Sequence, residues 1–415
     1  MSWNIKSKLK QALKGEEGTV FKDFGGKTSY ALIYPNTYNV GMSNLGVHNV
    51  YRLLNEQGNV VCERAFLPEK KDLREHERTG TPLMTVESQR PLADFDVVAF
   101  SVAYENDMPN IRTILDISSI KKGGRQRLLV GGAVATLNPG LFSEMFDEVI
   151  EGDFEEVSRS NGIQPARTVI WTRDTEFGSM HLVEVQRGCP HRCKFCAAPI
   201  IYQPFKQFGK EDIIKAIDAG LPHRKKIGLI GGDIFAHPDF VEIAEHIHSR
   251  QAAFSPSSVR ADRITPKIAE LLKISGHRTI TLAPEAGSES LRKSIGKNIP
   301  DEKFLRAADI LAERGIKQLK LYFMIGLPGE TEADIGSIAE FIRKIKGPAH
   351  GIKVTAAVNP FVPKRRTPFE GEAFTQISDL KLKMALLKKM VAKIGNVTLR
   401  TESPLNALRE YEWQK

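Results

Sequence analysis

Residues 181–196 read HLVEVQRGCPHRCKFC and join an apolar, strand-like run directly to three cysteines. These cysteines, Cys189, Cys193 and Cys196, follow the spacing C-x3-C-x2-C. Three thiolates at this spacing can hold three irons of a cubane cluster and leave the fourth iron without a protein ligand. Because a cluster that only carries electrons normally has all four irons ligated, the spacing predicts a cluster with one open iron.

Zinc is the structural alternative for the same cysteines. A structural zinc site takes four protein ligands, and Cys62 is the only other cysteine of the chain, although His191 lies inside the motif and could serve as a ligand. We favour the cluster because the cysteine trio follows directly on a predicted strand. Cys62 itself follows Val60 and Val61 in a strand-like run, which indicates a buried, unreactive thiol.

The run before the cysteines is the first of several strand patterns that alternate with helical ones. We expect strands at 181–186, 226–230, 253–259, 279–283, 318–324 and 352–358, with helices at 211–219, 240–250, 266–275, 301–314 and 332–345. Parallel strands joined by right-handed helical crossovers curl into a barrel, so the pattern predicts an open, partial (β/α)6 barrel. In such barrels the chemistry gathers at the C-terminal ends of the strands.

The first part of the chain predicts a second α/β unit. Strand patterns at 30–34, 96–102, 128–130 and 148–150 alternate with helical patterns, which is typical of a doubly wound, Rossmann-like parallel sheet. We therefore expect an N-terminal extension at 1–25, the doubly wound domain at 26–157, a linker at 158–174, the barrel at 175–370 and a C-terminal helical extension at 371–415.

Composition indicates a globular protein of a reducing compartment. A length of 415 residues suits two or three domains. No apolar run approaches the about 18 residues that cross a bilayer, and the N-terminus lacks the apolar centre of a signal peptide. Three of the four cysteines fall within eight residues, unlike a disulfide framework. We expect a cytoplasmic protein without a membrane partner, and its net charge of +9 makes a nucleic acid possible as a partner.

The cysteine loop, with the aromatic Phe195 before its last cysteine, resembles the radical S-adenosylmethionine (SAM) superfamily. Polar and glycine-rich stretches at the ends of later predicted strands agree with this resemblance in order and spacing: 231–233, 257–260, 283–288 and 324–330. The resemblance implies a 4Fe–4S cluster on the three cysteines and SAM at the open iron. It also implies an electron donor such as flavodoxin or ferredoxin, whose electron cleaves SAM to a 5′-deoxyadenosyl radical.

The same resemblance implies particular contacts with SAM. Asp233 stands where the superfamily usually has the Glu that receives the amino group of SAM. Residues of 283–288 would meet the ribose and carboxylate, and residues of 324–330 would pack against adenine. The residues that we expect around SAM are Phe195, Gly231, Gly232, Asp233, Ser258, Arg260, Glu285, Ser288, Met324, Gly326 and Leu327. A structural role stays open for Glu285, which could pair with Arg292.

Four stretches of the first part of the chain, 34–64, 95–104, 131–139 and 147–156, carry a second resemblance. Together they resemble the cobalamin-binding-like domain that precedes some radical SAM barrels, in a subfamily of unassigned substrate. The resemblance implies cobalamin at the strand ends, near Met42, Ser43, Gly46, Tyr104, Gly131, Gly132, Glu151 and Gly152. No D-x-H-x-x-G sequence is present. We interpret His48, inside a helical pattern, as a packed or exposed residue and not as a cobalt ligand. The domain could instead be a cover that closes the barrel without binding a cofactor.

These resemblances imply an enzyme, a cobalamin-dependent radical SAM methyltransferase. The alternative is a radical SAM enzyme without functional cobalamin that modifies RNA, a protein or a small molecule by rearrangement or group insertion. Methylthiotransfer is less favoured, because such enzymes usually carry another cysteine trio and only Cys62 remains here. A non-catalytic iron–sulfur or zinc-binding module is the third class that stays open.

Overall fold

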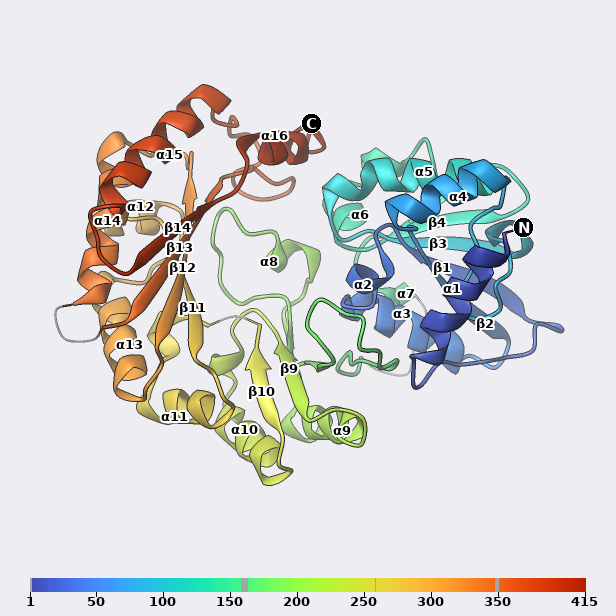
Figure 1. Ribbon diagram of the computed structural model, residues 1–415, viewed down its shortest axis with the longest axis horizontal. Coiled ribbons are helices and arrows are strands. Elements are labelled where there is room, and N and C mark those ends of the chain that lie inside the picture. Colours follow the sequence, from blue (N-terminus) through green and yellow to red (C-terminus); the bar gives the residue numbers. More distant parts are fainter. Residues whose placement is uncertain (1, 158–162, 258, 348–350) are drawn as a thin grey trace. The chain divides into compact units, whose positions relative to one another are not determined.

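The computed structural model describes residues 2–157, 163–257, 259–347 and 351–415 (Figure 1). The chain forms two compact units. The first contains residues 1–183 and 215–224, and the second contains residues 184–214 and 225–415. These units include the segments that we expected as separate extensions: residues 1–25 belong to the first unit and 371–415 to the second. In the described parts of the chain, no helix has the length and apolar composition of a membrane span.

The first unit is built on a parallel five-stranded sheet. Its strands are β1 (Thr28–Tyr34), β2 (Val60–Phe66), β3 (Val97–Ser101), β4 (Arg127–Gly131) and β5 (Glu148–Val149). They lie in the order β2-β1-β3-β4-β5, and every neighbouring pair is parallel. This order is that of a doubly wound sheet whose strand order reverses between β1 and β3. Figure 1 shows α3 (Leu45–Glu56) on one face of the sheet and α5 (Met108–Ser118) on the other.

Local sequence explains why the main helix of this unit begins where it does. The side chain of Asn44 accepts a hydrogen bond from the backbone N–H of Val47, so it caps the N-terminus of α3. Val47, Tyr51 and Leu54 then recur on one face and are buried in the apolar cluster against β1 and β2. The remaining helices of the unit are α1 (Trp3–Lys14), α2 (Tyr38–Gly41), α4 (Lys70–Thr79), α6 (Ala133–Leu137) and α7 (Phe154–Val157).

The second unit contains the expected alternation of parallel strands and helices. One sheet has the order β10-β9-β6 and the other the order β11-β12-β13-β14. The strands are β6 (His181–Glu184, where the chain passes between the units), β9 (Lys226–Ile230), β10 (Ala253–Pro256), β11 (Thr279–Glu285), β12 (Gln318–Ile325), β13 (Lys353–Pro360) and β14 (Val397–Thr401). All six predicted strands are present. Among the described residues no ladder joins β10 to β11, so a continuous six-stranded barrel stays a prediction.

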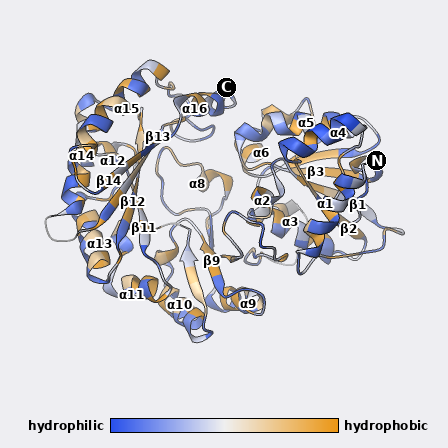
Figure 2. Ribbon diagram, in the orientation of Figure 1, coloured by the Kyte–Doolittle hydropathy of each residue, from blue (hydrophilic) through white to orange (hydrophobic). Residues whose placement is uncertain are grey.

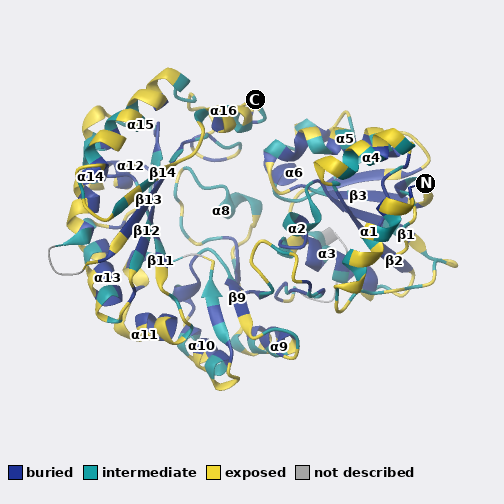
Figure 3. Ribbon diagram, in the orientation of Figure 1, coloured by how far each residue is buried: buried dark blue, intermediate teal, exposed yellow. Residues whose placement is uncertain are grey.

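The helices of this unit also match the prediction, with ends that differ by one residue at most. They are α9 (Lys210–Gly220, of which residues 215–220 belong to the first unit), α10 (Phe240–Ser249), α11 (Pro266–Ile274), α13 (Asp301–Glu313) and α14 (Glu332–Lys346). Figure 1 shows α10, α11, α13 and α14 on the outer side of an arc of strands. Along these helices hydrophobic colours alternate with hydrophilic ones in Figure 2, and buried with exposed ones in Figure 3. Their buried residues are all apolar, which is the pattern of helices that cover one face of a sheet.

The C-terminal segment differs from the expected helical extension. It contains α15 (Ile377–Val391) and α16 (Pro404–Glu412), but β14 lies between them and adds a strand parallel to β13. No residue of β14 is buried. An edge strand of this kind lacks the apolar run by which we recognised the other strands.

Candidate active site

The three cysteines lie in a loop whose base is closed by a short antiparallel pair. β7 (Gln186–Arg187) pairs with β8 (Lys206–Gln207), so residues 188–205 leave and rejoin the unit at one point. Gly188 opens the loop with φ of +79°, and a Cβ there would stand 2.6 Å from the carbonyl oxygen of Tyr202. Only glycine fits this close approach. Cys189, Cys193 and Cys196 are partly buried in the loop and form no disulfide.

Burial and nearby cations shift the pKa of the three thiols in opposite directions. Burial raises the pKa of Cys189, Cys193 and Cys196 above the ordinary range. The positive charges of Lys297 and Arg260 lower the pKa of Cys189 and Cys193, but by less than burial raises it. A coordinated metal deprotonates such thiols. In the described parts of the chain, no three His, Cys, Asp or Glu residues are grouped to hold a single metal ion.

The end of β9 packs directly against the cysteine loop. A Cβ on Gly232 would lie 2.8 Å from Cβ of Cys189 and 3.1 Å from its sulfur, so glycine is required there. Next to it, Asp233 is only 2% exposed. Its backbone N–H donates to Oε1 of Gln186 at 3.1 Å. Its Oδ2 lies 2.7 Å from Nε2 of His191, whereas its buried Oδ1 has no hydrogen-bond partner within the described structure.

The end of β11 carries a strained glutamate that is held by a lysine. Glu285 has φ of +70° and lies at a shift of the β11–β12 register. Its Oε1 accepts a hydrogen bond from Nζ of Lys297 at 2.8 Å. The suggested pairing with Arg292 is therefore wrong. Arg292 is completely buried, donates to the carbonyl oxygens of Ala286 and Gly287 and pairs with Asp301.

Ser288 and Gly326 have structural partners at the positions where we expected SAM contacts. The Ser288 hydroxyl accepts from the N–H of Leu291, caps α12 (Glu289–Ser294) and donates to Asp334. Gly326 has φ of +81°, and a Cβ there would stand 2.8 Å from Oγ1 of Thr375. These contacts explain the two residue types without a cofactor, so their contacts with SAM stay predictions.

An apolar cluster joins the cysteine loop to the ends of β11 and β12. Phe195 and Met324 are partly buried and pack against a buried group that comprises Ala286, Leu291, Ile295, Leu327, Phe361 and Phe369. The fold thus brings Phe195 to Met324 and Leu327, which lie far from it in the sequence. Ser258 lies outside the described residues. Sequence reasoning missed Lys297 and also Arg263, whose Nε donates to Oδ2 of Asp233 at 3.4 Å. Neither residue belongs to a motif at a strand end.

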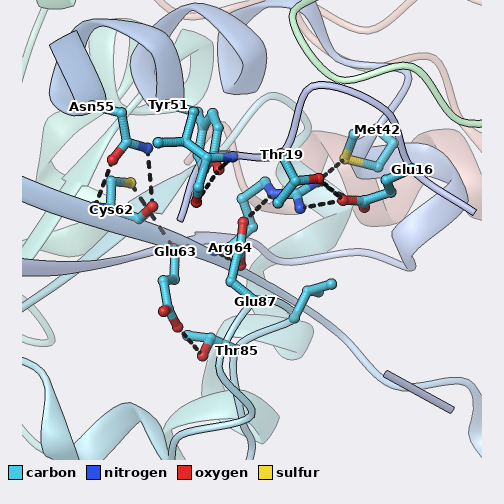
Figure 4. Close-up of polar contacts among 12 residues, drawn as sticks. Glu16, Thr19, Met42, Tyr51, Asn55, Cys62, Glu63, Arg64, Thr85 and Glu87 are labelled. Carbon is cyan, nitrogen blue, oxygen red and sulfur yellow. Dashed lines mark hydrogen bonds and ion pairs between the residues drawn. The ribbon is translucent and has the colours of Figure 1, made fainter. Parts of the chain in front are cut away.

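In the first unit, part of the expected cobalamin site is covered. Met42 is buried with its sulfur 3.1 Å from Nη1 of Arg64 (Figure 4). The Ser43 hydroxyl donates to the carbonyl oxygen of Asn39 and accepts from the N–H of Glu176. Gly46 lies within the first turn of α3. Ser43 and Met42 thus have partners inside the unit, so their contacts with cobalamin stay predictions.

His48 is a packed histidine, as predicted. Its Nε2 lies 3.0 Å from the carbonyl oxygen of Met42, and its Nδ1 accepts from the N–H of Val169 at 3.4 Å. Burial lowers its pKa to about 4, so the imidazole is neutral at pH 7. Both ring nitrogens are therefore used inside the unit, and neither is available to cobalt.

The remaining predicted residues lie at the ends of β3, β4 and β5. Tyr104 is 39% exposed, and Glu151 is also exposed. Gly131 and Gly132 end β4; Gly132 has φ of +101°, and a Cβ on it would stand 2.7 Å from the carbonyl oxygen of Val102. Gly152 has φ of +79° and open space around the position of a Cβ. This edge of the sheet is accessible, unlike the Met42 loop.

Two family models match the chain with this geometry. The model of the radical SAM superfamily matches residues 183–342, and the model of the N-terminal part of radical SAM proteins matches residues 46–167. The chain carries radical SAM superfamily domains. It is a radical SAM enzyme, and its radical SAM match contains the cysteine loop and the ends of β9, β11 and β12. This family implies a 4Fe–4S cluster and SAM as cofactors.

Individual relatives agree with the family. An uncharacterized protein of Methanocaldococcus jannaschii is 29% identical over 399 residues, which are 88% of this chain and 84% of that protein. The ribosomal protein uS12 methylthiotransferase RimO of Acetivibrio thermocellus is 23% identical over 57% of this chain and 60% of its own length. Among solved structures, the radical SAM methyltransferase TsrM from Kitasatospora setae matches 83% of this chain and 74% of its own at 12% identity, with a TM-score of 0.58. This likeness shows that the two proteins share a fold.

The residues at the cysteine loop fit the two cofactors that the family implies. Three partly buried thiols can serve as iron ligands. Oδ1 of Asp233, which has no hydrogen-bond partner among the described residues, is a buried acceptor that a charged amino group can satisfy. The cluster around Phe195, Met324 and Leu327 supplies an apolar surface of the kind that a purine base packs against.

Proposed function

We propose that this radical SAM enzyme is a cobalamin-dependent methyltransferase. The observation that carries the proposal is a doubly wound parallel sheet, of order β2-β1-β3-β4-β5, placed ahead of the radical SAM domain in one chain. Such a sheet binds flat or extended ligands at the C-terminal ends of its strands. The fold likeness to a methyltransferase over 83% of the chain supports the same reaction class.

At the radical SAM site, each group of side chains has a distinct task. Cys189, Cys193 and Cys196 would hold the cluster, and Oδ1 of Asp233 would accept from the amino group of SAM. Phe195 and its neighbours would flank the adenine and exclude water. The cluster and SAM, when bound and reduced by a donor such as flavodoxin or ferredoxin, supply a 5′-deoxyadenosyl radical.

For cobalamin, the accessible candidates are the residues at the ends of β3 and β5. Tyr104, Glu151 and Gly152 would contact it there. Residues 97–157 contain no histidine, and His48 is bonded elsewhere, so these loops would hold cobalamin without a histidine ligand to cobalt. Cobalamin, when bound, supplies a methyl group that a substrate radical can take up.

The relatives named methylthiotransferases suggest another reaction, which the cysteines of this chain do not support. Outside the loop the chain has only Cys62. That thiol lies in the middle of β2 with no exposure, and burial raises its pKa far above the ordinary range. A buried, protonated thiol is a poor iron ligand. We therefore retain methyl transfer as the proposal.

The test is anaerobic purification of the chain with cobalamin supplied during expression. We expect about four irons and four sulfides per chain, a retained corrinoid absorbance band, and 5′-deoxyadenosine or S-adenosylhomocysteine on reduction with SAM. Deoxyadenosine without a corrinoid band would favour the alternative, rearrangement or group insertion on RNA, a protein or a small molecule. Absence of both products, with the cluster intact, would leave only an iron–sulfur binding module.

A further inference from the structure

The two carboxylate oxygens of Asp233 have different surroundings. Three nitrogen donors converge on Oδ2: Nε2 of His191 at 2.7 Å, Nε of Arg263 at 3.4 Å and Nε of Arg260 at 3.6 Å. Within the described structure, the buried Oδ1 has no hydrogen-bond partner. Buried carboxylate oxygens are rarely left without a donor, since the lost hydration is not replaced. The asymmetry indicates that Oδ1 is kept for a ligand.

His191 makes the shortest of these contacts, and its position in the sequence gives the contact a second consequence. The residue stands between Cys189 and Cys193, so its hydrogen bond joins the cysteine loop to the end of β9. The backbone N–H of Asp233 is fixed independently by Gln186 at 3.1 Å. With the backbone held by Gln186, the remaining freedom of Asp233 is rotation of its carboxylate. His191 at Oδ2 opposes that rotation.

The two arginines are less suited to this task. Their guanidinium nitrogens lie beyond ideal hydrogen-bond distance from Oδ2. Arg260 donates with good geometry to Asp262 at 3.0 and 3.1 Å instead, and the Arg263 side chain is 42% exposed. Nε of Arg263 still donates a hydrogen bond to Oδ2 at 3.4 Å, whereas Arg260 contributes only charge. The shortest contact with Oδ2, at 2.7 Å, comes from His191.

We propose that His191 is a positioning residue, whose hydrogen bond to Oδ2 of Asp233 turns Oδ1 toward the amino group of SAM. The inference rests on the proposed radical SAM site and adds a residue to it. Asp is one methylene shorter than the Glu expected at this position, so its reach depends more on a fixed rotamer. Groups that orient a ligand-binding residue typically change affinity through it by about 10- to 100-fold.

The test compares His191→Ala with His191→Gln in the reconstituted holoenzyme. The Gln amide can place a donor near the position of Nε2, so it is the conservative variant. Arg192→Ala is the matched control, because Arg192 is exposed in the same loop. For each protein the readouts are iron and sulfide per chain, the dissociation constant for SAM by equilibrium dialysis, and the shift of the reduced-cluster EPR signal on adding SAM.

We expect wild-type iron content in all three variants. For His191→Ala the dissociation constant should rise about 10- to 100-fold with a weakened EPR shift, and for His191→Gln it should stay within about threefold of wild type. Equal affinity in wild type and His191→Ala would overturn the inference. Equally weak binding of SAM by His191→Gln would also overturn it. Loss of the cluster in His191→Ala would overturn it as well, because His191 would then support the cysteine loop. Failure of the wild type itself to bind SAM would instead overturn the proposed function.

Discussion

Arg64 and Glu87 form an ion pair that is closed off from solvent, with Nε of the guanidinium 2.7 Å from Oε1 of the carboxylate (Figure 4). Nη2 of the same guanidinium lies 2.7 Å from Oε2 of Glu16, and all three charged side chains are at most 1% exposed. β2 is thereby joined to the segment after α1 and to the loop that carries Glu87. This buried triad ties together parts of the first unit that no sheet ladder connects.

Replacing Arg64 by Met should destabilise the first unit by about 3–5 kcal/mol, because two buried carboxylates lose their cation. Thermal unfolding of the purified variant, followed by circular dichroism, measures the effect. Arg78→Met is the control, since Arg78 pairs with Glu75 at the surface, where ion pairs contribute little. Equal midpoints for Arg64→Met and wild type would show that the triad does not stabilise the unit.

The contribution of Asp107 to the stability of the fold should decrease as pH rises. Burial raises its pKa to about 6, although Asn36 and Asn110 donate to its carboxylate. An acid whose folded pKa lies above the unfolded value stabilises the fold at low pH, and that contribution is lost as pH rises through about 6. Asp107→Asn keeps the acceptor and removes the charge. It should exceed wild type in stability by about 2 kcal/mol at pH 7.5 and by less than about 1 kcal/mol at pH 4.

The control for Asp107 is a carboxylate with the opposite shift. Hydrogen bonds from the backbone and side chain of Ser29 lower the pKa of Asp96. Its contribution is present above its unfolded pKa and is lost as pH falls through the folded one. Asp96→Asn should therefore be less stable than wild type at pH 7.5 and converge with it in acid. Urea titrations across pH 4–8 measure the stability of both variants. If both were more stable than wild type at pH 7.5, or both less stable, the two assigned pKa shifts would be contradicted.

The sequence predicted most of the parallel framework, because strands covered on both faces read as continuous apolar runs. β9 was predicted to the residue, whereas β14 was missed because none of its residues is buried. The candidate site likewise has residues that the sequence predicted and residues that it did not. The cysteines and Gly232 are predictable from local spacing. The pairing of Lys297 with Glu285 is not, because it depends on how two loops cross and no pattern in either loop encodes it.

The hydrogen bond between Glu176 and Ser43 was equally beyond sequence reasoning. Glycine and small polar residues after a strand predict a ligand loop, and that is what we expected there. In the structure, the N–H of Glu176 bonds to the Ser43 hydroxyl, across 133 positions of sequence. A contact over that separation leaves no periodic signal in either segment, so only the folded chain reveals it.

Replacing each of the four cysteines by Ala should distinguish the three predicted cluster ligands from Cys62. Cys189→Ala, Cys193→Ala and Cys196→Ala should each lose the cluster absorbance after anaerobic reconstitution, because three thiolates are the fewest that hold the cubane. Cys62→Ala should keep wild-type iron and sulfide, since this thiol is buried in β2 of the other unit. Iron retained in any of the first three variants, or lost in Cys62→Ala, would refute the ligand assignment.

Lys297 should set the reduction potential of the cluster. Its ammonium pairs with Glu285, is mostly buried, and lowers the pKa of Cys193 and Cys189 against the larger effect of burial. A cation that stabilises thiolates also stabilises an added electron, because both changes add negative charge at one place. Lys297→Met should therefore make the midpoint potential more negative, by on the order of 30–60 mV, equivalent to roughly 1 kcal/mol. EPR-monitored redox titration measures the change. Lys293→Met, which removes an exposed charge from α12, should leave the potential unchanged, and an equal shift in both variants would show that the position of Lys297 is unimportant.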